Sequence, residues 1–270
     1  MVRDNRRWVV ALLTALSSLA AVAEPLAIPG TGACEAVLRE LAQVYGGETV
    51  DIPPSTGSTG GTKAVRVGRA LLGRVSRPLT DEERADGLRY QSFARDAAVF
   101  VSGSGVGVKS LTSTQVRDIF SGQIRRWADV GGIDSPIRVV TRETTDAAAT
   151  ALRKGFPAFA DAKTFDGAKL AARDSENLEL LLRYKAAIGL SSRAEARLAG
   201  DRLVPLAVDG IAATPETIRS GHYPAVMEHA FVWKGKLAPQ AERFIKFVQT
   251  PQGHAILAKF GLIPMNHDGG

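Results

Sequence analysis

A run of small residues at positions 55–63 (STGSTGGTK) follows the strand-like residues 49–52 and strongly limits how this part of the chain can fold. Its three glycines permit a tight turn and a close approach of the backbone to a ligand. Hydroxyl groups and free N–H groups of the turn and of the next helix then point the same way, as they do around a bound oxyanion. The same composition is also typical of a plain loop, so the neighbouring segments have to decide between the two interpretations.

Two further turns follow short strands. Residues 30–33 (GTGA) connect an apolar strand at 25–29 to a helix that begins near Cys34, and residues 76–83 (SRPLTDEE) follow residues 70–75. In the second turn, Thr80 and Glu83 have the spacing of a helix capping box. Ligands of open α/β sheets bind at the carboxyl ends of strands, so three such turns predict one convergent site in an α/β protein. We expect Cys34 to be a small buried residue rather than a reactive thiol, because no His or second Cys is nearby.

The first 23 residues have the pattern of a secretory signal peptide. Arg3, Arg6 and Arg7 precede an apolar run over 8–22, and the small residues at 21–23 (AVA) form a cleavage pattern before Glu24. A membrane anchor is the alternative, but it needs about 20 apolar residues, and this run is shorter. The sequence therefore predicts an exported mature chain that is not embedded in a membrane.

Composition narrows the possible partners. The chain has 270 residues, of which 45% are hydrophobic and 23% charged, so it can bury a sizeable core. Loss of residues 1–23 removes three Arg and one Asp and lowers the formal net charge from +6 to +4. No block of five basic residues occurs and aromatic residues make up 6%, which argues against a nucleic-acid surface and leaves small anions as plausible partners. The single cysteine excludes an intramolecular disulfide.

The rest of the chain alternates between strands and helices. The glycine-rich residues 102–107 follow a buried strand at 97–101, and we interpret them as a hinge between domains. The segment 111–132 begins with a capped helix that has Val116, Ile119 and Phe120 on its apolar face and Gly122 as a natural C-cap. Further strands are expected at 137–140, 186–190, 203–206 and 228–233, and the strand at 203–206 is expected to return toward the first domain. Amphipathic helices are expected at 239–248 and 251–260.

Several of these motifs resemble the periplasmic phosphate-binding proteins of ABC transporters. The likeness rests on GTGA, GSTGG, SRPLTDEE, LTSTQVRDIFSGQIRRWADVGG, IRVVTRE and the closing GLIPM, which occur in the order of that family and cover nearly the whole mature chain. The resemblance implies an α/β fold with two lobes, each a mixed sheet flanked by helices, and a ligand cleft between them. Lobe 1 would comprise residues 24–104 and 205–270, and lobe 2 residues 105–204.

The resemblance also implies a function and a set of ligand contacts. The protein would be a periplasmic solute-binding protein, expected as a monomer, that captures phosphate or a similar small oxyanion for uptake, with an ABC permease as its implied partner. Arginine suits such a site because its planar guanidinium bonds two oxygens at once. The residues expected to contact the ligand are Ala33, Cys34, Ser58, Thr59, Gly60, Ser76, Arg77, Arg142, Thr145 and Asp146.

The fourth loop departs from the family pattern. The family has a glycine-serine-glycine-threonine loop after its arginine, whereas this chain has Arg142 and Glu143 followed by TTDAA at 144–148, and it has Arg77 where many members have an aspartate. Asp146 at the start of a helix has a common structural role as an N-cap. Alternatively, Asp146 or Glu143 accepts the proton of a protonated oxyanion and so favours phosphate over sulfate, or the carboxylate repels anions and the site has changed its ligand.

Two other functional classes stay open at this point. An enzyme would need a nucleophile with a base, or metal ligands at fixed spacing, and the four histidines are scattered toward the C-terminus without such a pattern. We therefore expect neither catalysis, nor a metal, nor a cofactor. A protein of the same fold that serves sensing, adhesion or assembly, with an altered or lost anion site, is the main alternative to transport, and the 144–148 loop is the feature that favours it.

Overall fold

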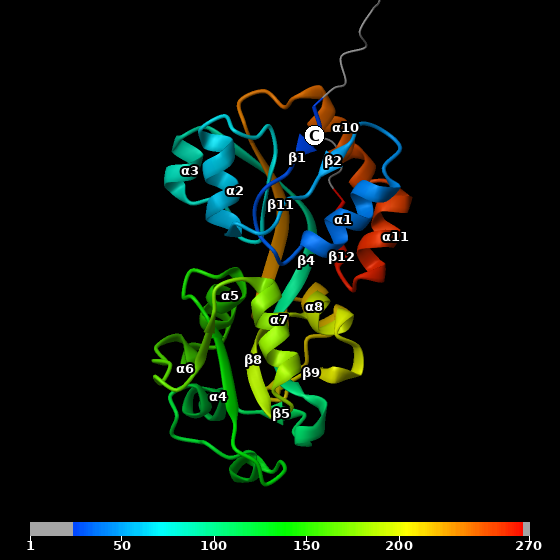
Figure 1. Cartoon of the computed structure of the whole chain (residues 1–270). Coiled ribbons are helices and arrows are strands. Elements are labelled where there is room, and N and C mark those ends of the chain that lie inside the picture. The colour runs from blue at the N-terminus through cyan, green and yellow to red at the C-terminus, as the bar shows by residue number, and fades with distance from the viewer. Residues whose placement is uncertain (1–23, 267–270) are drawn as a thin grey trace, which may run out of the picture.

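The computed structural model describes residues 24–266, and the expected signal peptide lies outside them. The chain forms two lobes, one above the other in Figure 1, which are joined by the two long strands β4 (Leu88–Gly103) and β11 (Val226–Lys234). Both ends of the described chain lie in the upper lobe, and the middle of the chain forms the lower one. The chain thus passes between the lobes twice.

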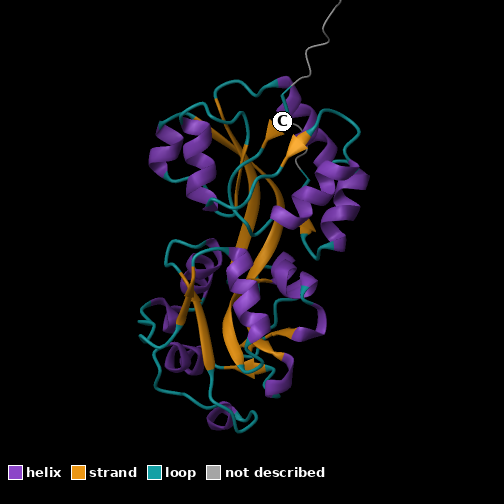
Figure 2. Ribbon diagram, in the orientation of Figure 1, coloured by secondary structure: helices purple, strands orange, loops and turns teal. Residues whose placement is uncertain are grey.

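Helices and strands alternate along the chain as the sequence predicts (Figure 2). The helices are α1 (Glu35–Val44), α2 (Gly57–Arg66), α3 (Asp81–Ala85), α4 (Ser113–Phe120), α5 (Ala147–Gly155), α6 (Pro157–Ala160), α7 (Asp174–Arg183), α8 (Arg193–Leu198), α9 (Pro215–Arg219), α10 (Pro239–Val248) and α11 (Pro251–Lys259). The remaining strands are β1 (Leu26–Ala27), β2 (Val50–Asp51), β3 (Gly73–Val75), β5 (Ser110–Leu111), β6 (Arg138–Arg142), β7 (Lys169–Ala171), β8 (Ala187–Ser192), β9 (Leu203–Pro205), β10 (Ala207–Val208) and β12 (Ile263–Pro264).

One mixed sheet runs through both lobes because β4 belongs to each of them. Its strand order is β3-β11-β4-β8-β6-β7, and β9 and β12 pair with β4 off this path. The first half of β4 pairs antiparallel with β11, and its second half, Ala98–Ser102, pairs antiparallel with β8. All six residues of β8 are buried, as expected for a central strand covered on both faces. Parallel pairing of β6 with β7 and β8 brings the carboxyl ends of these strands to the interlobe side.

The apolar side chains separate into clusters that mark the lobes. The largest cluster takes its members from residues 97–227, with Ile263 from β12, and a second takes them from residues 26–94 and 231–262, with Ala194 from α8. The larger cluster contains Val106, at 1% exposure, so the expected hinge at 102–107 lies inside the second lobe. Likewise β9 pairs with β4 within that lobe and does not return to the first. We propose lobe boundaries near residues 96 and 226, in place of the expected 104/105 and 204/205.

Local sequence signals account for the ends of several helices. The capping box of Thr80 and Glu83 at α3 is confirmed, and Thr112 with Gln115 forms another at α4. The predicted apolar face of α4 is buried, and Gly122 follows that helix with a φ of +77°. Among the described helices, none has the length and the apolar character that a membrane crossing requires.

Candidate functional site

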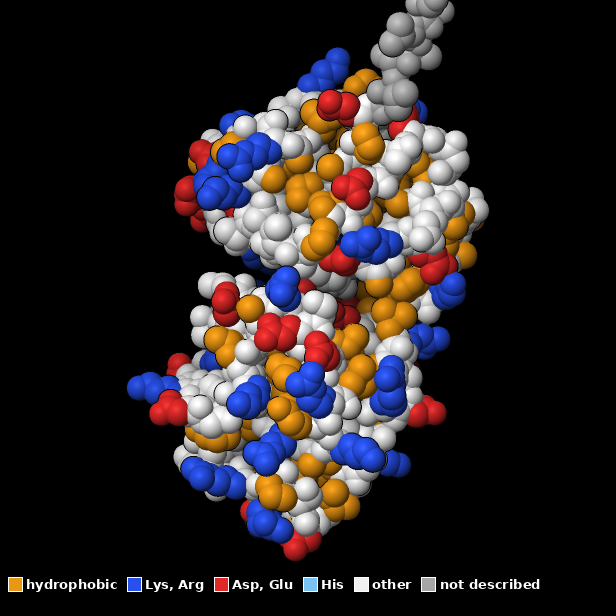
Figure 3. Space-filling model, in the orientation of Figure 1, with side chains coloured by type: hydrophobic (Ala, Val, Ile, Leu, Met, Phe, Trp, Pro, Cys, Tyr) orange, Lys and Arg blue, Asp and Glu red, His pale blue; other side chains and the backbone are white. Residues whose placement is uncertain are grey.

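A cavity of about 330 Å³ lies between the lobes, where the loops before α1, α2, α5 and α7 meet. In Figure 3 the molecule narrows at this level, and both acidic and basic side chains lie along the narrow part. The cavity is lined by Thr31, Ser55, Thr56, Gly57, Ser58, Thr59, Arg77, Arg142, Glu143, Thr145, Asp146, Ala147, Ala172, Arg173 and Asp174. Two lobes therefore contribute to one polar cleft.

Arg74 anchors the loops before α1 and α2 by donating hydrogen bonds to their backbone oxygens. Its side chain is fully buried, and it donates to the backbone oxygens of Thr31 and Pro53 at 2.7 Å each, and also to that of Ile28. Gly30 packs so tightly here, at φ +148°, that a Cβ on it would lie 1.9 Å from the Arg74 backbone oxygen. Only glycine fits this position, which explains the first glycine of the GTGA turn.

The helices α1 and α2 both begin without a side-chain cap, and the first residues of α2 line the 330 Å³ cavity. Cys34 and Thr56 occupy their N-cap positions, and neither makes a side-chain cap hydrogen bond. The Ser58 hydroxyl, in the first turn of α2, accepts the N–H of Ser76 at 3.0 Å, so the second and third loops are joined. The N–H of Gly57 donates to Ser55 Oγ, while Ser58 and Thr59 in the same first turn line the cavity. The start of α2 therefore gives the cleft wall of lobe 1 a positive partial charge that suits an anion.

The third loop contributes Ser76 and Arg77, but Arg77 is already paired. Its guanidinium makes a bidentate contact with Glu83, with two N···O distances of 2.8 Å. The hydrogen bonds from Arg77 lower the pKa of Glu83 to about 2, so the pair is ionised at neutral pH. Arg77 therefore lines the cleft as half of an ion pair rather than as a free cation.

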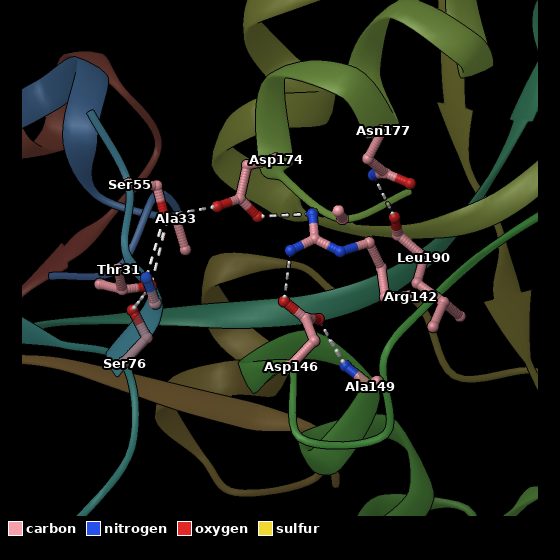
Figure 4. A network of polar contacts seen from close by, with 12 residues as sticks. Thr31, Ala33, Ser55, Ser76, Arg142, Asp146, Ala149, Asp174, Asn177 and Leu190 are labelled. Atoms are coloured by element: carbon pink, nitrogen blue, oxygen red, sulfur yellow. Dashed lines mark hydrogen bonds and ion pairs between the residues drawn. The ribbon is translucent and has the colours of Figure 1, made fainter. Parts of the chain in front are cut away.

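The fourth loop and the start of α7 surround Arg142 with carboxylates (Figure 4). Its Nη1 lies 2.9 Å from Oδ1 of Asp174, and its Nη2 lies 3.0 Å from Oδ2 of Asp146. The other Asp174 oxygen accepts the hydroxyl of Ser55 at 3.4 Å, which links lobe 2 to lobe 1 across the cleft. Oδ1 of Asp146 accepts the N–H of Ala149 at 3.0 Å, so Asp146 is the N-cap of α5. The structural role expected for Asp146 is confirmed.

Burial and charge shift the pKa values of the acids around Arg142. Burial raises the pKa of Asp146, while the charge of Arg142 acts in the opposite direction. Glu195, which lines a small adjoining cavity together with Asp146 and Asp174, has its pKa raised to about 8, first by burial and second by the charge of Asp174. Among the residues lining the main cavity, three arginines face three carboxylates, so the formal charge of the lining is balanced.

The structure brings most of the predicted ligand residues to this cleft. Ser58, Thr59, Arg77, Arg142, Thr145 and Asp146 line the 330 Å³ cavity. Ala33 lines the small adjoining cavity, and Ser76 lines a neighbouring one of about 530 Å³ that shares Arg77 and Ala147 with the first. Cys34 and Gly60 line none of these three. The Cys34 side chain is 1% exposed and burial raises its pKa to about 12, so the expectation of an unreactive buried thiol is supported.

Asp174, Ser55 and Thr31 line the cleft but were not among the ligand contacts expected from the sequence. A signal existed for Asp174, because it follows the short strand β7 and begins α7, and acidic residues are favoured in a first helical turn. The approach of its carboxylate to Arg142 depends on the packing of α7 against β6 and β8, which sequence spacing does not reveal. Within residues 24–266, no group of three or more His, Cys, Asp or Glu residues is placed to hold a metal ion.

Comparisons with known proteins agree with this geometry. Residues 17–252 match the family model of the PBP superfamily domain. The chain is 26% identical to the phosphate-binding protein PstS of Bacillus subtilis, over 89% of this chain and 80% of that protein. A putative phosphate ABC transporter substrate-binding protein from Clostridium perfringens, solved with bound phosphate, is 27% identical, with a TM-score of 0.81 over 90% of this chain and all of that one. A phosphate transport receptor from Vibrio cholerae, 23% identical, shares the fold with a TM-score of 0.68. The chain belongs to the PBP superfamily and has its two-lobed, type II periplasmic-binding-protein fold.

Proposed function

We propose that this protein captures inorganic phosphate, or a similar small oxyanion, in the interlobe cleft and delivers it to an ABC transporter for uptake. The observation that carries the proposal is the convergence of Thr31, the uncapped N-terminus of α2 and Arg142 on one cavity. Burying an anion requires fixed donors in place of its water shell, and helix N–H groups with a guanidinium supply them. The relatives named above support phosphate as the first ligand to test.

The proposal includes export of the protein. A signal peptide over residues 1–23 would send the mature chain to the periplasm, where such a protein meets its ligand. The permease partner is inferred from the names of the relatives, and catalysis is not part of the proposed role.

A second candidate is a protein of the same fold whose anion site has been lost. It is favoured by the fourth loop, where Asp146 caps α5 with its own carboxylate and, together with Asp174, pairs with Arg142. In that case Arg142 would not be available to a ligand, and the protein would serve sensing, adhesion or assembly.

Isothermal titration of the mature chain, after unfolding and refolding to strip any bound ligand, distinguishes these roles. Saturable binding of phosphate, with phosphatase turnover absent in the same sample, supports the transport proposal. Absence of heat with phosphate, sulfate and arsenate would refute it and favour the second candidate.

A further inference from the structure

Three buried polar side chains form a line that begins at the wall of the cleft and runs into the first lobe. Ser76 follows β3, His229 lies on β11 and Asp96 lies on β4, and their exposed fractions are 2%, 0% and 0%. The anion site proposed above assigns no role to His229 or Asp96. Burial of three polar groups in one row is costly unless they bond to one another or to the backbone.

The outer end of this line is joined to the cleft through Thr31. Nδ1 of His229 lies 2.7 Å from Oγ of Ser76, and the Ser76 hydroxyl donates to Oγ1 of Thr31 at 3.3 Å. The N–H of Ala33 also donates to Oγ1 of Thr31, at 3.4 Å (Figure 4). Thr31 lines the 330 Å³ cavity, so a continuous path of hydrogen bonds leads from His229 to the ligand space.

Counting protons fixes the direction of this path. A serine hydroxyl carries one proton, and that of Ser76 is given to Thr31. The short contact between Ser76 and His229 therefore needs the proton of Nδ1. Thr31 accepts two hydrogen bonds on Oγ1, which leaves its own proton to be donated into the cleft.

No hydrogen bond fixes a proton on the far ring nitrogen of His229 within residues 24–266. Nε2 of His229 lies 3.7 Å from Oδ2 of Asp96, beyond hydrogen-bond distance, and has no hydrogen-bond partner among residues 24–266. The Asp96 oxygens instead accept the N–H groups of Ala97 at 2.8 Å and Ala194 at 3.3 Å. A second proton on Nε2, facing the Asp96 carboxylate, would leave Nδ1–H in place and the direction unchanged.

We propose that His229 is a positioning residue for anion binding: its Nδ1–H donates to Ser76, Ser76 donates to Thr31, and Thr31 donates to the oxyanion. The acceptor at the end of this path rests on the function proposed above. The ring of His229 is held for this task by Phe93, whose ring stacks on it at 6.2 Å between centroids. Such a chain of aligned donors strengthens its last member, because each bond polarises the next.

The direction has a consequence for selectivity. If the path ran the other way, Thr31 would present lone pairs to the cleft and would favour an oxyanion that carries a proton. With donors pointing outward, the Thr31 hydroxyl serves sulfate and phosphate alike. Discrimination between these two anions must then come from other groups in the cleft.

The tautomer can be measured without any ligand. In protein labelled with ¹⁵N-histidine, long-range proton–nitrogen NMR spectra assign the protonated nitrogen of His229, and the His229→Gln variant identifies its signals. We expect a proton on Nδ1. A neutral ring protonated only on Nε2 would overturn the proposal, whatever the protein binds.

Variants test whether the path acts on the ligand. In His229→Asn the side-chain amide can keep a donor near the position of Nδ1, whereas His229→Leu removes it. Without the Nδ1–H donor, Ser76 and Thr31 are no longer held in line, and loss of the Thr31 hydrogen bond to a charged ligand corresponds to about a tenfold weaker affinity. We expect His229→Leu to weaken phosphate and sulfate binding by a similar factor, and His229→Asn to stay within about threefold of the parent protein.

The result that contradicts the inference is weaker phosphate binding together with stronger sulfate binding in His229→Leu, since only the reverse direction predicts it. Circular dichroism and the thermal midpoint check that both variants fold. If the unaltered protein binds no oxyanion, the proposed function fails, while the tautomer measurement still decides the direction of the path.

Discussion

Replacing Asp174 by Asn should strengthen anion binding, because the carboxylate of Asp174 competes with the ligand for Arg142. The guanidinium contacts Asp174 at 2.9 Å, and the two side chains are 9% and 20% exposed. A dianion against Arg142 would lie about 6 Å from that carboxylate. Its repulsion is roughly 1.4 kcal/mol at a dielectric constant of ~80 and twice that at ~40. Asp174→Asn should therefore tighten phosphate binding by about 1–3 kcal/mol, or roughly 5- to 150-fold in Kd.

The assay is isothermal titration with phosphate at low ionic strength, where screening is weak. Glu179→Gln is the matched control, because Glu179 lies on the same helix, α7, and pairs with the exposed Arg183 instead of with Arg142. It makes the same change of net charge and should leave the affinity unchanged. An Asp174→Asn variant that binds phosphate no more tightly than the control would refute the competition, and a weaker one would make Asp174 part of the binding site.

Three further predictions concern the acids and the thiol. Asp146→Asn should leave the ratio of phosphate to sulfate affinities unchanged, because both Asp146 oxygens already have partners, Ala149 N–H and Arg142; a lost preference for phosphate would restore Asp146 as the proton acceptor. The pKa of Glu195 is raised from 4.5 to about 8, so the folded state holds a proton that the unfolded state releases. Urea unfolding should show stability falling as the pH rises from about 4.5 to 8, by up to about 5 kcal/mol. Glu195→Gln should lose this slope, and a flat profile in the parent protein would contradict the raised pKa. Finally, the Cys34 thiol should react with a thiol reagent at pH 8 only after unfolding, since burial raises its pKa to about 12; rapid labelling of the native protein would contradict its burial.

Much of the fold follows from local signals in the sequence. The helices α1, α4, α10 and α11 have apolar residues at helical spacing, and each buries that face. The turns that follow β1, β2 and β3 meet at one cleft, as the rule for carboxyl ends of strands predicts. The capping box of α3 could be predicted because the two residues that form it, Thr80 and Glu83, are close together in the sequence.

The position at which the chain crosses from one lobe to the other could not be predicted from local signals. Residues 89–96 of β4 include Arg89, Gln91, Arg95 and Asp96, so the crossing strand lacks a continuous apolar run, and the glycine-rich residues that follow looked like the more flexible hinge. Glycine permits a bend, but the pairing of β4 with β8 and β9 holds residues 98–103 in the second lobe. Long-range pairing decided the position of the crossing, and local composition does not contain that information.

The candidate site was predictable in its hydroxyls and arginines but not in its ion pairs. Ser58, Ser76 and Arg142 lie where their motifs place them. Pairing of Arg77 with Glu83 links residues within one turn, yet the competing partners of Arg142 come from two elements, and Asp174 is 32 residues away along the chain. Asp96 and His229 meet only because β4 pairs with β11. Such contacts follow from sheet topology, which no single motif reports.

A crystal structure of the mature protein grown with phosphate tests the central claim most directly. The proposal predicts a tetrahedral anion in the interlobe cleft, bonded to Arg142, to the Thr31 hydroxyl and to N–H groups at the start of α2, with the Asp174 carboxylate moved away from the guanidinium. An empty cleft in which Asp174 still pairs with Arg142, at a phosphate concentration that saturates related proteins, would contradict it.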